Sequence, residues 1–195
     1  MVPEAGKTAT AAISLRPFAE QDYRLILAAI RSSDELLEWA GPDLHWPLDK
    51  ERLRDYGSPA APGASRFLTL SADESATATL VGHAQFAVNR DHDVGQVARV
   101  LIAPAVRGRG LCIALIGEIM RLGFDEMRLH RLGLNVFDGN TAAIACYERA
   151  DFVKEGHLRD VARASSGDLS VFVLGMLGSD PRPEPSATER GNQRE

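Results

Sequence analysis

The chain has 195 residues, of which 45% are hydrophobic and 25% charged, a composition typical of a globular protein. Its formal net charge of −5 argues against nucleic acid as the main partner, because phosphate neutralisation requires a basic surface. No apolar run approaches the roughly 20 residues that a membrane-spanning helix needs, so we expect no membrane partner.

Two segments poor in core-forming residues flank the part of the chain that is expected to fold. Residues 1–12 lack the basic start and apolar run of a secretory signal, and we predict a flexible N-terminal segment. Residues 178–195 carry three prolines at alternate positions and almost nothing apolar, which predicts a disordered tail. A single domain, long enough for a hydrophobic core, is therefore predicted over 13–177.

The expected elements of this domain are a mixture of strands and helices. In chain order they are a strand over 13–16, helices over 19–31, 33–39 and 50–56, strands over 66–71, 80–88 and 96–102, a helix over 108–127, a strand over 132–137, a helix over 141–150, and strands over 152–158 and 169–177. The order predicts an α+β (mixed αβ) fold with one strand–helix–strand crossover near its centre.

An unusual loop joins the strand over 96–102 to the helix expected over 108–127. It reads Arg107-Gly108-Arg109-Gly110. The first turn of a helix has unpaired backbone N–H groups and a partial positive charge, glycine allows close approach of the backbone, and arginine adds charge. These features are typical of a pyrophosphate site. A solvent-exposed connection with solubilising arginines is the alternative.

Two other phosphate-binding motifs are excluded. The sequence contains no GxxxxGK[ST] segment, so it has no Walker loop. The dinucleotide pattern GxGxxG requires glycine or alanine at position 113, where this chain has Ile113.

The cysteines and histidines give no sign of a metal site or a disulfide framework. The five histidines show no ligand spacing with one another or with cysteine, so no metal ligands are expected. Cys112 and Cys146 fall in predicted helices with no framework around them. This pattern favours reduced thiols and a cytoplasmic location.

Two segments carry a recognisable pattern. They read VLIAPAVRGRGLC at 100–112 and NVFDGNTAAIACYERADFVKEGHLRD at 135–160. Both resemble the GNAT superfamily of acetyl-CoA-dependent N-acetyltransferases. The second segment, with LRPFAEQDY and LLEWAGPDL nearer the N-terminus, is similar to the RimJ/RimL-type branch, which acetylates the N-termini of ribosomal proteins. The resemblance covers 13–177 and implies a single GNAT-type domain, whose mixed, mostly antiparallel sheet opens into a V between flanking helices.

The resemblance also implies roles for particular residues. Backbone groups of Val100, Leu101 and Ile102 would bind the acetyl carbonyl and the pantetheine arm of acetyl-CoA. The pyrophosphate would be held by the side chains of Arg107 and Arg109 and by the N–H groups of Gly108, Arg109, Gly110, Leu111 and Cys112. Asn140 would contact the cofactor's arm, and Tyr147 would protonate the departing CoA thiolate.

The spacing of Asn140 and Tyr147 agrees with a shared site. They are seven positions apart, which is two helical turns, so both can lie on one face. A plain helix N-cap for Asn140 and an ordinary half-buried aromatic for Tyr147 are the alternatives.

Three positions depart from the family's usual pattern. Cys112 stands where glycine or alanine is usual, and we expect it to act as a small buried filler. Asp151 stands where a glycine usually ends the helix in a left-handed conformation, at a cost of about 1 kcal/mol. Asn135 replaces the glutamate that several members use as a general base, so a water relay to Asp138 or Asp93 is considered in its place.

The missing base affects the expected acceptor. At pH 7.5 an α-amine with a pKa of about 7.8 is roughly one-third neutral, whereas a lysine amine is neutral about one time in a thousand. We therefore favour the N-terminal α-amine of a protein or peptide as acceptor. A small amine, such as a polyamine or an antibiotic, and a non-catalytic acyl-CoA-binding module are the alternatives.

The acceptor groove itself is less clear from the sequence. By resemblance, Trp39, Asp43, His45 and Trp46 lie in a segment that walls this groove. Packing of a loop onto the sheet explains them equally well, so they are assigned no role. We expect a monomer or a homodimer.

Overall fold

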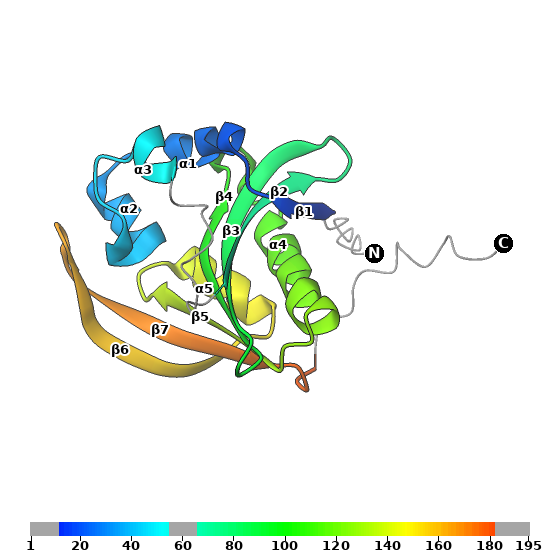
Figure 1. Ribbon diagram of the computed structural model, residues 1–195. Helices are drawn as coiled ribbons and strands as arrows, with labels where there is room; N and C mark the ends of the chain where they lie inside the picture. Colours follow the sequence, from blue (N-terminus) through cyan, green and yellow to red (C-terminus); the bar gives the residue numbers. More distant parts are fainter. Residues whose placement is uncertain (1–11, 55–65, 182–195) are drawn as a thin grey trace, which may run out of the picture.

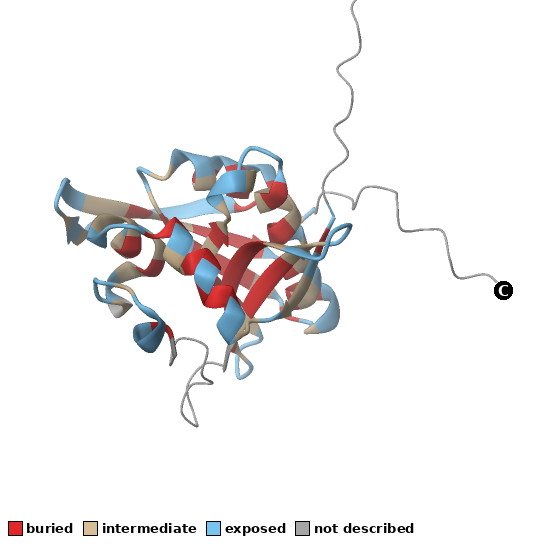
Figure 2. Ribbon diagram, turned by 90° about the horizontal axis from the view of Figure 1, so that it is seen from above, coloured by how far each residue is buried: buried red, intermediate tan, exposed pale blue. Residues whose placement is uncertain are grey.

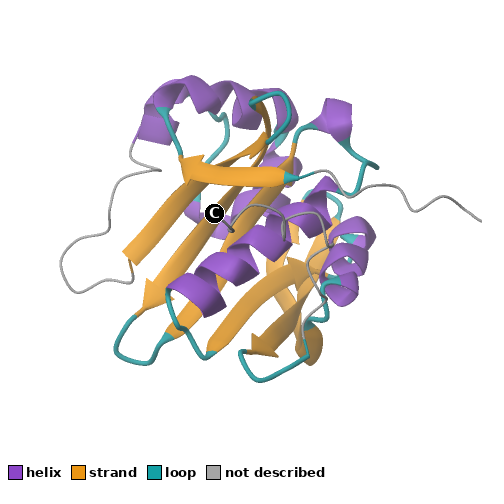
Figure 3. Cartoon of the chain, turned by 90° about the vertical axis from the view of Figure 1, so that its right-hand side faces the viewer, coloured by secondary structure: helices purple, strands orange, loops and turns teal. Residues whose placement is uncertain are grey.

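A seven-stranded sheet forms the centre of the computed structural model, which describes residues 12–54 and 66–181. The strand order is β1-β2-β3-β4-β5-β7-β6. Figure 1 shows α1, α2 and α3 grouped at one end of the sheet, with α4 on the opposite side. Figure 3 colours helices and strands differently and shows α4 crossing in front of the strands.

The strands occupy the predicted segments, and most of them are longer than predicted. Their bounds are β1 Ile13–Pro17, β2 Arg66–Glu74, β3 Thr79–Asn89, β4 Val94–Ile102, β5 Arg131–Phe137, β6 Val153–Ala164 and β7 Gly167–Leu177. Neighbouring strands are antiparallel except for β4 and β5, which are parallel. The predicted α+β fold with one strand–helix–strand crossover is thus confirmed.

The N-terminal helices are shorter than predicted. In place of one helix over 19–31, a 3-10 turn at Glu20–Asp22 leads into α1, Tyr23–Ala29. The next helix, α2, spans Ser33–Ala40 and is followed by Gly41, whose φ of 68° is left-handed. Asp49 Oδ1 accepts a hydrogen bond from the Arg52 N–H at the start of α3, Lys50–Arg54. The rest of the predicted helix lies outside the described residues.

The crossover helix α4 begins at Leu111 and ends at Met120, and a π-helical turn follows over Arg121–Glu126. The prediction of a start at 108 was wrong, because Gly108 and Gly110 have φ values of 81° and 78°, which a right-handed helix does not accept. After β5 comes α5, Thr141–Arg149.

Two hydrophobic clusters fill the two sides of the sheet. The larger cluster joins the strands to α4 and α5, and the smaller one joins α1, α2 and α3 to Leu101 of β4. Figure 2 shows the buried residues concentrated in the middle strands and along one side of α4. At Gly95 a Cβ atom would lie 2.5 Å from the buried Phe86 ring, so this position of β4 needs glycine for close packing.

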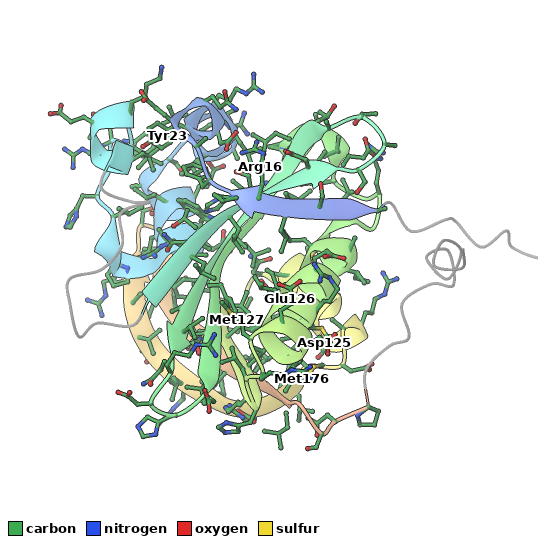
Figure 4. All side chains as sticks on the ribbon, turned by 45° about the vertical axis from the view of Figure 1, so that its right-hand side comes forward. Arg16, Tyr23, Asp125, Glu126, Met127 and Met176 are labelled. Atoms are coloured by element: carbon green, nitrogen blue, oxygen red, sulfur yellow. A yellow bond between two sulfur atoms is a disulfide. The ribbon has the colours of Figure 1, made fainter. Side chains whose placement is uncertain are left out.

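An ion pair between the partly exposed Arg16 and the buried Asp22 fixes β1 to the turn that follows it. The Arg16 guanidinium donates two hydrogen bonds, of 2.6 and 2.9 Å, to the Asp22 carboxylate, and its Nε donates to Asp73 at 2.7 Å. The Ser71 hydroxyl on β2 also donates to Asp22, at 2.7 Å. Figure 4 labels Arg16 on β1 and Tyr23 at the start of α1. The network holds the N-terminal helices against the sheet.

The ends of the chain are described only in part. The predictions of a flexible N-terminal segment and a disordered tail fall mostly on 1–11 and 182–195, outside the described residues. Gly178 continues from β7, with its N–H donating to the carbonyl of His130 at 2.8 Å. Within the described ranges, the helices are too short or too polar to cross a bilayer.

Candidate functional site

The central feature of the site is the divergence of β4 and β5. Their pairing joins Val94–Val97 to Arg131–Leu134, and no pair is formed beyond Val97 and Leu134 in the described part of the chain. β4 nevertheless continues to Ile102, and β5 to Phe137. Because the two strands are parallel, both unpaired ends lie at the same end of the sheet, as Figure 1 shows. The predicted V-shaped opening is confirmed by this pairing.

The three β4 residues predicted to bind the acetyl group lie on this unpaired half of the strand. Leu101 is opposite His83 of β3 and Ile102 is opposite Gly82. The Leu101 side chain packs with α1 and α2, whereas Val100 and Ile102 pack on the α4 side. Their backbone on the β5 side is not used in the β4–β5 ladder.

The amino end of α4 faces solvent next to Ile102. Gly110 is the N-cap in a left-handed conformation, and no side chain caps the first turn. The loop residues Arg107, Gly108, Arg109 and Gly110 are exposed. An uncapped first turn leaves its N–H groups able to donate to an anion, so this end of α4 fits a pyrophosphate. No group of three possible metal ligands occurs among the described residues.

The two arginines of the loop are both engaged within the protein. Arg107 Nε donates to the carbonyl of Ile102 at 3.2 Å, which folds the loop back onto the end of β4. Arg109 forms an ion pair with Glu74 at the end of β2, and the Arg109 side chain remains half-exposed. Glu74 was not singled out from the sequence, because its approach to Arg109 depends on the β1–β2–β3 arrangement. Glu74 therefore partly neutralises the positive charge that Arg109 would present to an anion at this loop.

Asn140 and Tyr147 lie on α5, as predicted. The Asn140 side chain caps the helix, its Oδ1 accepting from the Ala143 N–H at 3.1 Å. Capping therefore accounts for this asparagine, and a contact with the cofactor stays a prediction. Tyr147 is 6% exposed and packs against Phe152, with ring centroids 6.2 Å apart.

The buried Tyr147 stays protonated over a wide pH range. Burial raises its pKa above the ordinary value of 10, because the phenolate would lose its hydration. The hydroxyl thus stays protonated at neutral pH and above. The proton is therefore available at all these pH values, but the hydroxyl is a weaker acid than a thiol, whose ordinary pKa is about 8.5, and donation to the CoA thiolate stays a prediction.

The structure corrects the prediction for the cysteines. Cys112 and Cys146 are joined by a disulfide, with Cα atoms 6.3 Å apart, and no free cysteine occurs in the described residues. The expectation of reduced thiols, with Cys112 as a filler, was wrong for this structure. Spacing in the sequence could not reveal the pair, because 34 residues separate the two cysteines and only the packing of α4 beside α5 brings them together.

The structure confirms one expectation for the departures from the family pattern and shows where another departure, Asn135, lies. Asp151 has a φ of 63°, the left-handed conformation predicted for the end of α5. Asn135 is exposed on β5 between the buried Leu134 and Val136, so it lies on the opposite face from α5.

The two carboxylates considered as replacements for a base differ in position. Asp93 precedes β4, so it lies roughly 20 Å along the strand from Val100 and cannot serve the site. Asp138 follows β5 at the open end, where its Oδ2 is 3.1 Å from His157 Nε2.

Two residues near the site were not assigned a role from the sequence. Arg99 has a φ of 51° and lies directly before the segment that is predicted to bind the acetyl group. Trp39 of α2 donates through its indole Nε1 to the carbonyl of Arg99 at 2.9 Å. A left-handed arginine within a strand has no signature in a single sequence, since it depends on the pairing of β3 with β4.

Two surface pockets lie elsewhere. One of about 490 Å³ is lined by residues 124, 125, 128–130 and 177–179, and one of about 290 Å³ by residues at the end of β3 and the start of β4 and β5. Both are at the amino ends of β4 and β5, opposite to the open end. The candidate site therefore rests on the strand divergence and the end of α4.

Comparisons with known proteins agree with this geometry. The profile of the "Acetyltransferase (GNAT) family" matches residues 33–152. Spermidine N(1)-acetyltransferase of Vibrio cholerae serotype O1 is 37% identical over 60 residues, which is 31% of this chain and 35% of that protein. The chain thus aligns with about a third of the length of this curated relative.

Solved structures share the fold over a longer stretch. Spermidine N-acetyltransferase from Vibrio cholerae, in complex with CoA and spermine, superposes with a TM-score of 0.72 at 22% identity, covering 86% of this chain and 96% of that one. A dodecameric structure of the same enzyme in an intermediate state gives a TM-score of 0.65 at 23% identity, covering 86% and 94%.

Proposed function

The chain belongs to the GNAT family of acetyl-CoA-dependent N-acetyltransferases, and we propose that its acceptor is a primary amine of a polyamine such as spermidine. The observation that carries this choice is the 37% identity to a spermidine N(1)-acetyltransferase over 60 residues. It favours the small-amine alternative over both the N-terminal α-amine and the RimJ/RimL-type branch. The acidic net charge of −5 also suits a polycationic acceptor better than an anionic one.

The proposed reaction is a direct transfer. The neutral amine attacks the thioester carbonyl of acetyl-CoA, so that a C–N bond forms and the C–S bond then breaks. Backbone N–H groups near Leu101 and Ile102 stabilise the oxyanion of the tetrahedral intermediate. The attacking nitrogen loses its extra proton to water, Tyr147 donates a proton to the departing CoA thiolate and regains one from solvent, and the amide leaves as the acetylated product.

The loop before α4 is proposed to hold the pyrophosphate of the same cofactor. The uncapped N–H groups from Gly108 to Cys112 and the charge of Arg107 and Arg109 support this placement. Val100, Leu101 and Ile102 of β4 would take the acetyl and pantetheine portions, and Asn140, at the start of α5, would contact the arm of the cofactor.

A peptide α-amine is the second candidate acceptor, and Asn135 favours it. A polyamine amine resembles lysine, with a pKa near 10.4, and is neutral about one time in a thousand at pH 7.5. An α-amine needs no strong base at that pH. The two acceptors therefore predict different pH profiles as well as different rates.

The test is a panel of acceptors read by release of free CoA. Spermidine and spermine are compared with a peptide whose only amine is its N-terminus and with an N-blocked peptide that has a single lysine. We expect kcat/KM for spermidine to exceed that for either peptide at least tenfold and to rise with pH up to about 9 to 10. Faster turnover of the α-amine peptide, with a plateau near pH 8, would instead establish the second candidate. Binding of CoA without release from any acceptor would indicate a non-catalytic module.

Location and assembly are proposed from the sequence alone. A cytoplasmic location stays the prediction, and a disulfide there would be open to reduction. A monomer or homodimer is expected, and light scattering on the purified protein distinguishes these from a larger assembly such as the dodecamer described for the Vibrio cholerae enzyme.

A further inference from the structure

A bulge in β4 lies immediately before the segment proposed to bind the acetyl group. Gln85 of β3 pairs with Ala98 and His83 pairs with Leu101, so Arg99 and Val100 together oppose the single residue Ala84. Such a bulge bends the strand that contains it and changes the strand's direction. One residue, Ala98, separates this bulge from Val97, which forms the last β4–β5 pair.

The backbone at this bulge is strained. Arg99 has a φ of 51°, a left-handed conformation that is unfavourable for a residue with a Cβ. Conformations of this kind persist where the surrounding structure holds them. The contacts of Arg99 therefore decide the direction in which Val100, Leu101 and Ile102 leave the bulge.

Three hydrogen bonds hold Arg99 from two elements. The Trp39 indole Nε1 donates to the Arg99 carbonyl at 2.9 Å, and Arg99 Nη2 donates back to the Ala40 carbonyl at 3.3 Å, so α2 contacts both the backbone and the side chain. Arg99 Nη1 donates to Gln85 Oε1. Gln85 is 2% exposed and is itself fixed by a 3.1 Å bond from its Nε2 to Thr69 on β2.

A buried aromatic ring packs beside the Trp39 indole. The Trp39 ring lies 5.9 Å from the ring of His83, which is fully buried on β3. Burial, followed by the nearby charge of Arg99, lowers the pKa of His83 to about 3, so the imidazole is neutral and adds no second positive charge beside Arg99.

We infer that Trp39 and Arg99 are positioning residues for acetyl transfer. Their hydrogen bonds hold the β4 bulge, an arrangement that we call the clasp, and so orient the backbone N–H groups of the following segment toward the acetyl carbonyl. The inference rests on the acetyl-binding role proposed for Val100, Leu101 and Ile102. It adds that α2, on the acceptor side, sets the geometry of the strand that activates the thioester. Loss of the clasp should impair the chemical step more than cofactor binding, since the pyrophosphate loop lies outside it.

The test uses Trp39→Phe, which keeps an aromatic ring, though a smaller one, and removes the N–H donor. Calorimetric titration with CoA counts the intact cofactor sites and gives the affinity. Infrared spectra of bound acetyl-CoA labelled with ¹³C at the carbonyl report the hydrogen bonding of that group. We expect CoA affinity within about twofold of wild type, turnover per CoA site about tenfold lower, and a carbonyl stretch shifted to higher frequency.

Two further variants make the result decisive. Arg99→Lys keeps the charge but loses the paired hydrogen bonds to Gln85 and Ala40. If Trp39→Phe does not fold, Arg99→Lys should show the same loss of turnover per CoA site with nearly unchanged CoA affinity. Trp46→Phe makes the same chemical change at an indole that is 44% exposed, and its carbonyl stretch should match wild type. The inference is overturned if the stretch and the turnover per site stay at the wild-type values in both clasp variants, or if Trp46→Phe gives the same shift. The infrared measurement needs no acceptor, so it stands even if the polyamine proposal fails.

Discussion

Cys112 and Cys146 form a disulfide that joins the second residue of α4 to the residue directly before Tyr147. The bond thus connects the helix whose amino end is proposed to hold the pyrophosphate with the helix that carries the proposed acid. Two parts of the site that belong to different elements are in this way held at a fixed separation.

Loss of this disulfide should lower stability. A cross-link between residues 34 positions apart contributes about 3–4 kcal/mol in the chain-entropy account. We therefore expect a reductant to lower the melting temperature of the wild-type protein, and the Cys112→Ser/Cys146→Ser double variant to melt at a lower temperature that reductant does not change. Alkylation of both thiols in the denatured, unreduced protein would contradict the bond.

Removal of the Tyr147 hydroxyl should slow turnover without weakening cofactor binding. Tyr147→Phe keeps the packing on Phe152 and removes only the proton donor, so we expect kcat to fall about a hundredfold. The affinity for CoA should stay within about twofold. Because burial raises the pKa of Tyr147 above 10, the wild-type kcat should show no loss from this group as the pH rises to 10.

The matched control for this variant is Tyr23→Phe. It makes the same change at another buried tyrosine, on α1, in the smaller hydrophobic cluster. Its turnover should remain near the wild-type value. An equal loss in both variants would show that the effect of Tyr147→Phe is on packing, and an unchanged kcat would remove Tyr147 from the mechanism.

The ion pair between Arg109 and Glu74 should weaken binding of the pyrophosphate. Glu74→Gln removes the carboxylate that competes for the guanidinium, so we expect CoA to bind a few-fold more tightly at low salt. The gain should shrink as ionic strength rises. Pantetheine, which has no pyrophosphate, serves as the control ligand, and a similar gain for pantetheine would place the effect elsewhere.

Much of the fold could be predicted because its signals are local. Strands such as β3 and β5 follow from runs of apolar residues between turns, and α5 follows from its helical periodicity behind the capping side chain of Asn140. The left-handed Asp151 could also be anticipated, because the family that the sequence resembles usually has a glycine at this helix end. In each case neighbouring residues in the sequence determine the conformation.

The features that escaped prediction depend on contacts between distant segments. Arg99 is left-handed because β3 and β4 pair with a bulge, and Trp39 reaches it across 60 positions. Cys112 meets Cys146, and Arg109 meets Glu74, for the same reason. The loop and the tyrosine could thus be nominated from the sequence, while the residues that orient or neutralise them required the structure.

Acid should destabilise the protein through Asp22. Burial opposes ionisation of this carboxyl, but hydrogen bonds from Arg16, the Ala19 N–H and Ser71 outweigh it and lower its pKa from 3.8 to about 2. A carboxyl with a lowered pKa contributes stability that is fully present above its unfolded pKa and is lost as the pH falls toward the folded value. The contribution is about 2 kcal/mol, lost between about pH 5 and pH 2.

The variant Asp22→Asn checks this prediction in urea unfolding at several pH values. It should lower the free energy of unfolding by about 2–4 kcal/mol at pH 7, because Arg16 loses its carboxylate partner in a buried position. Its deficit relative to wild type should shrink toward pH 2, where the wild-type carboxyl also becomes protonated. Asp91→Asn, in the exposed turn between β3 and β4, should have the same free energy of unfolding as wild type at every pH measured. A deficit for Asp22→Asn that stays constant from pH 7 to pH 2 would mean that lost packing, and not the charge of Asp22, accounts for the change.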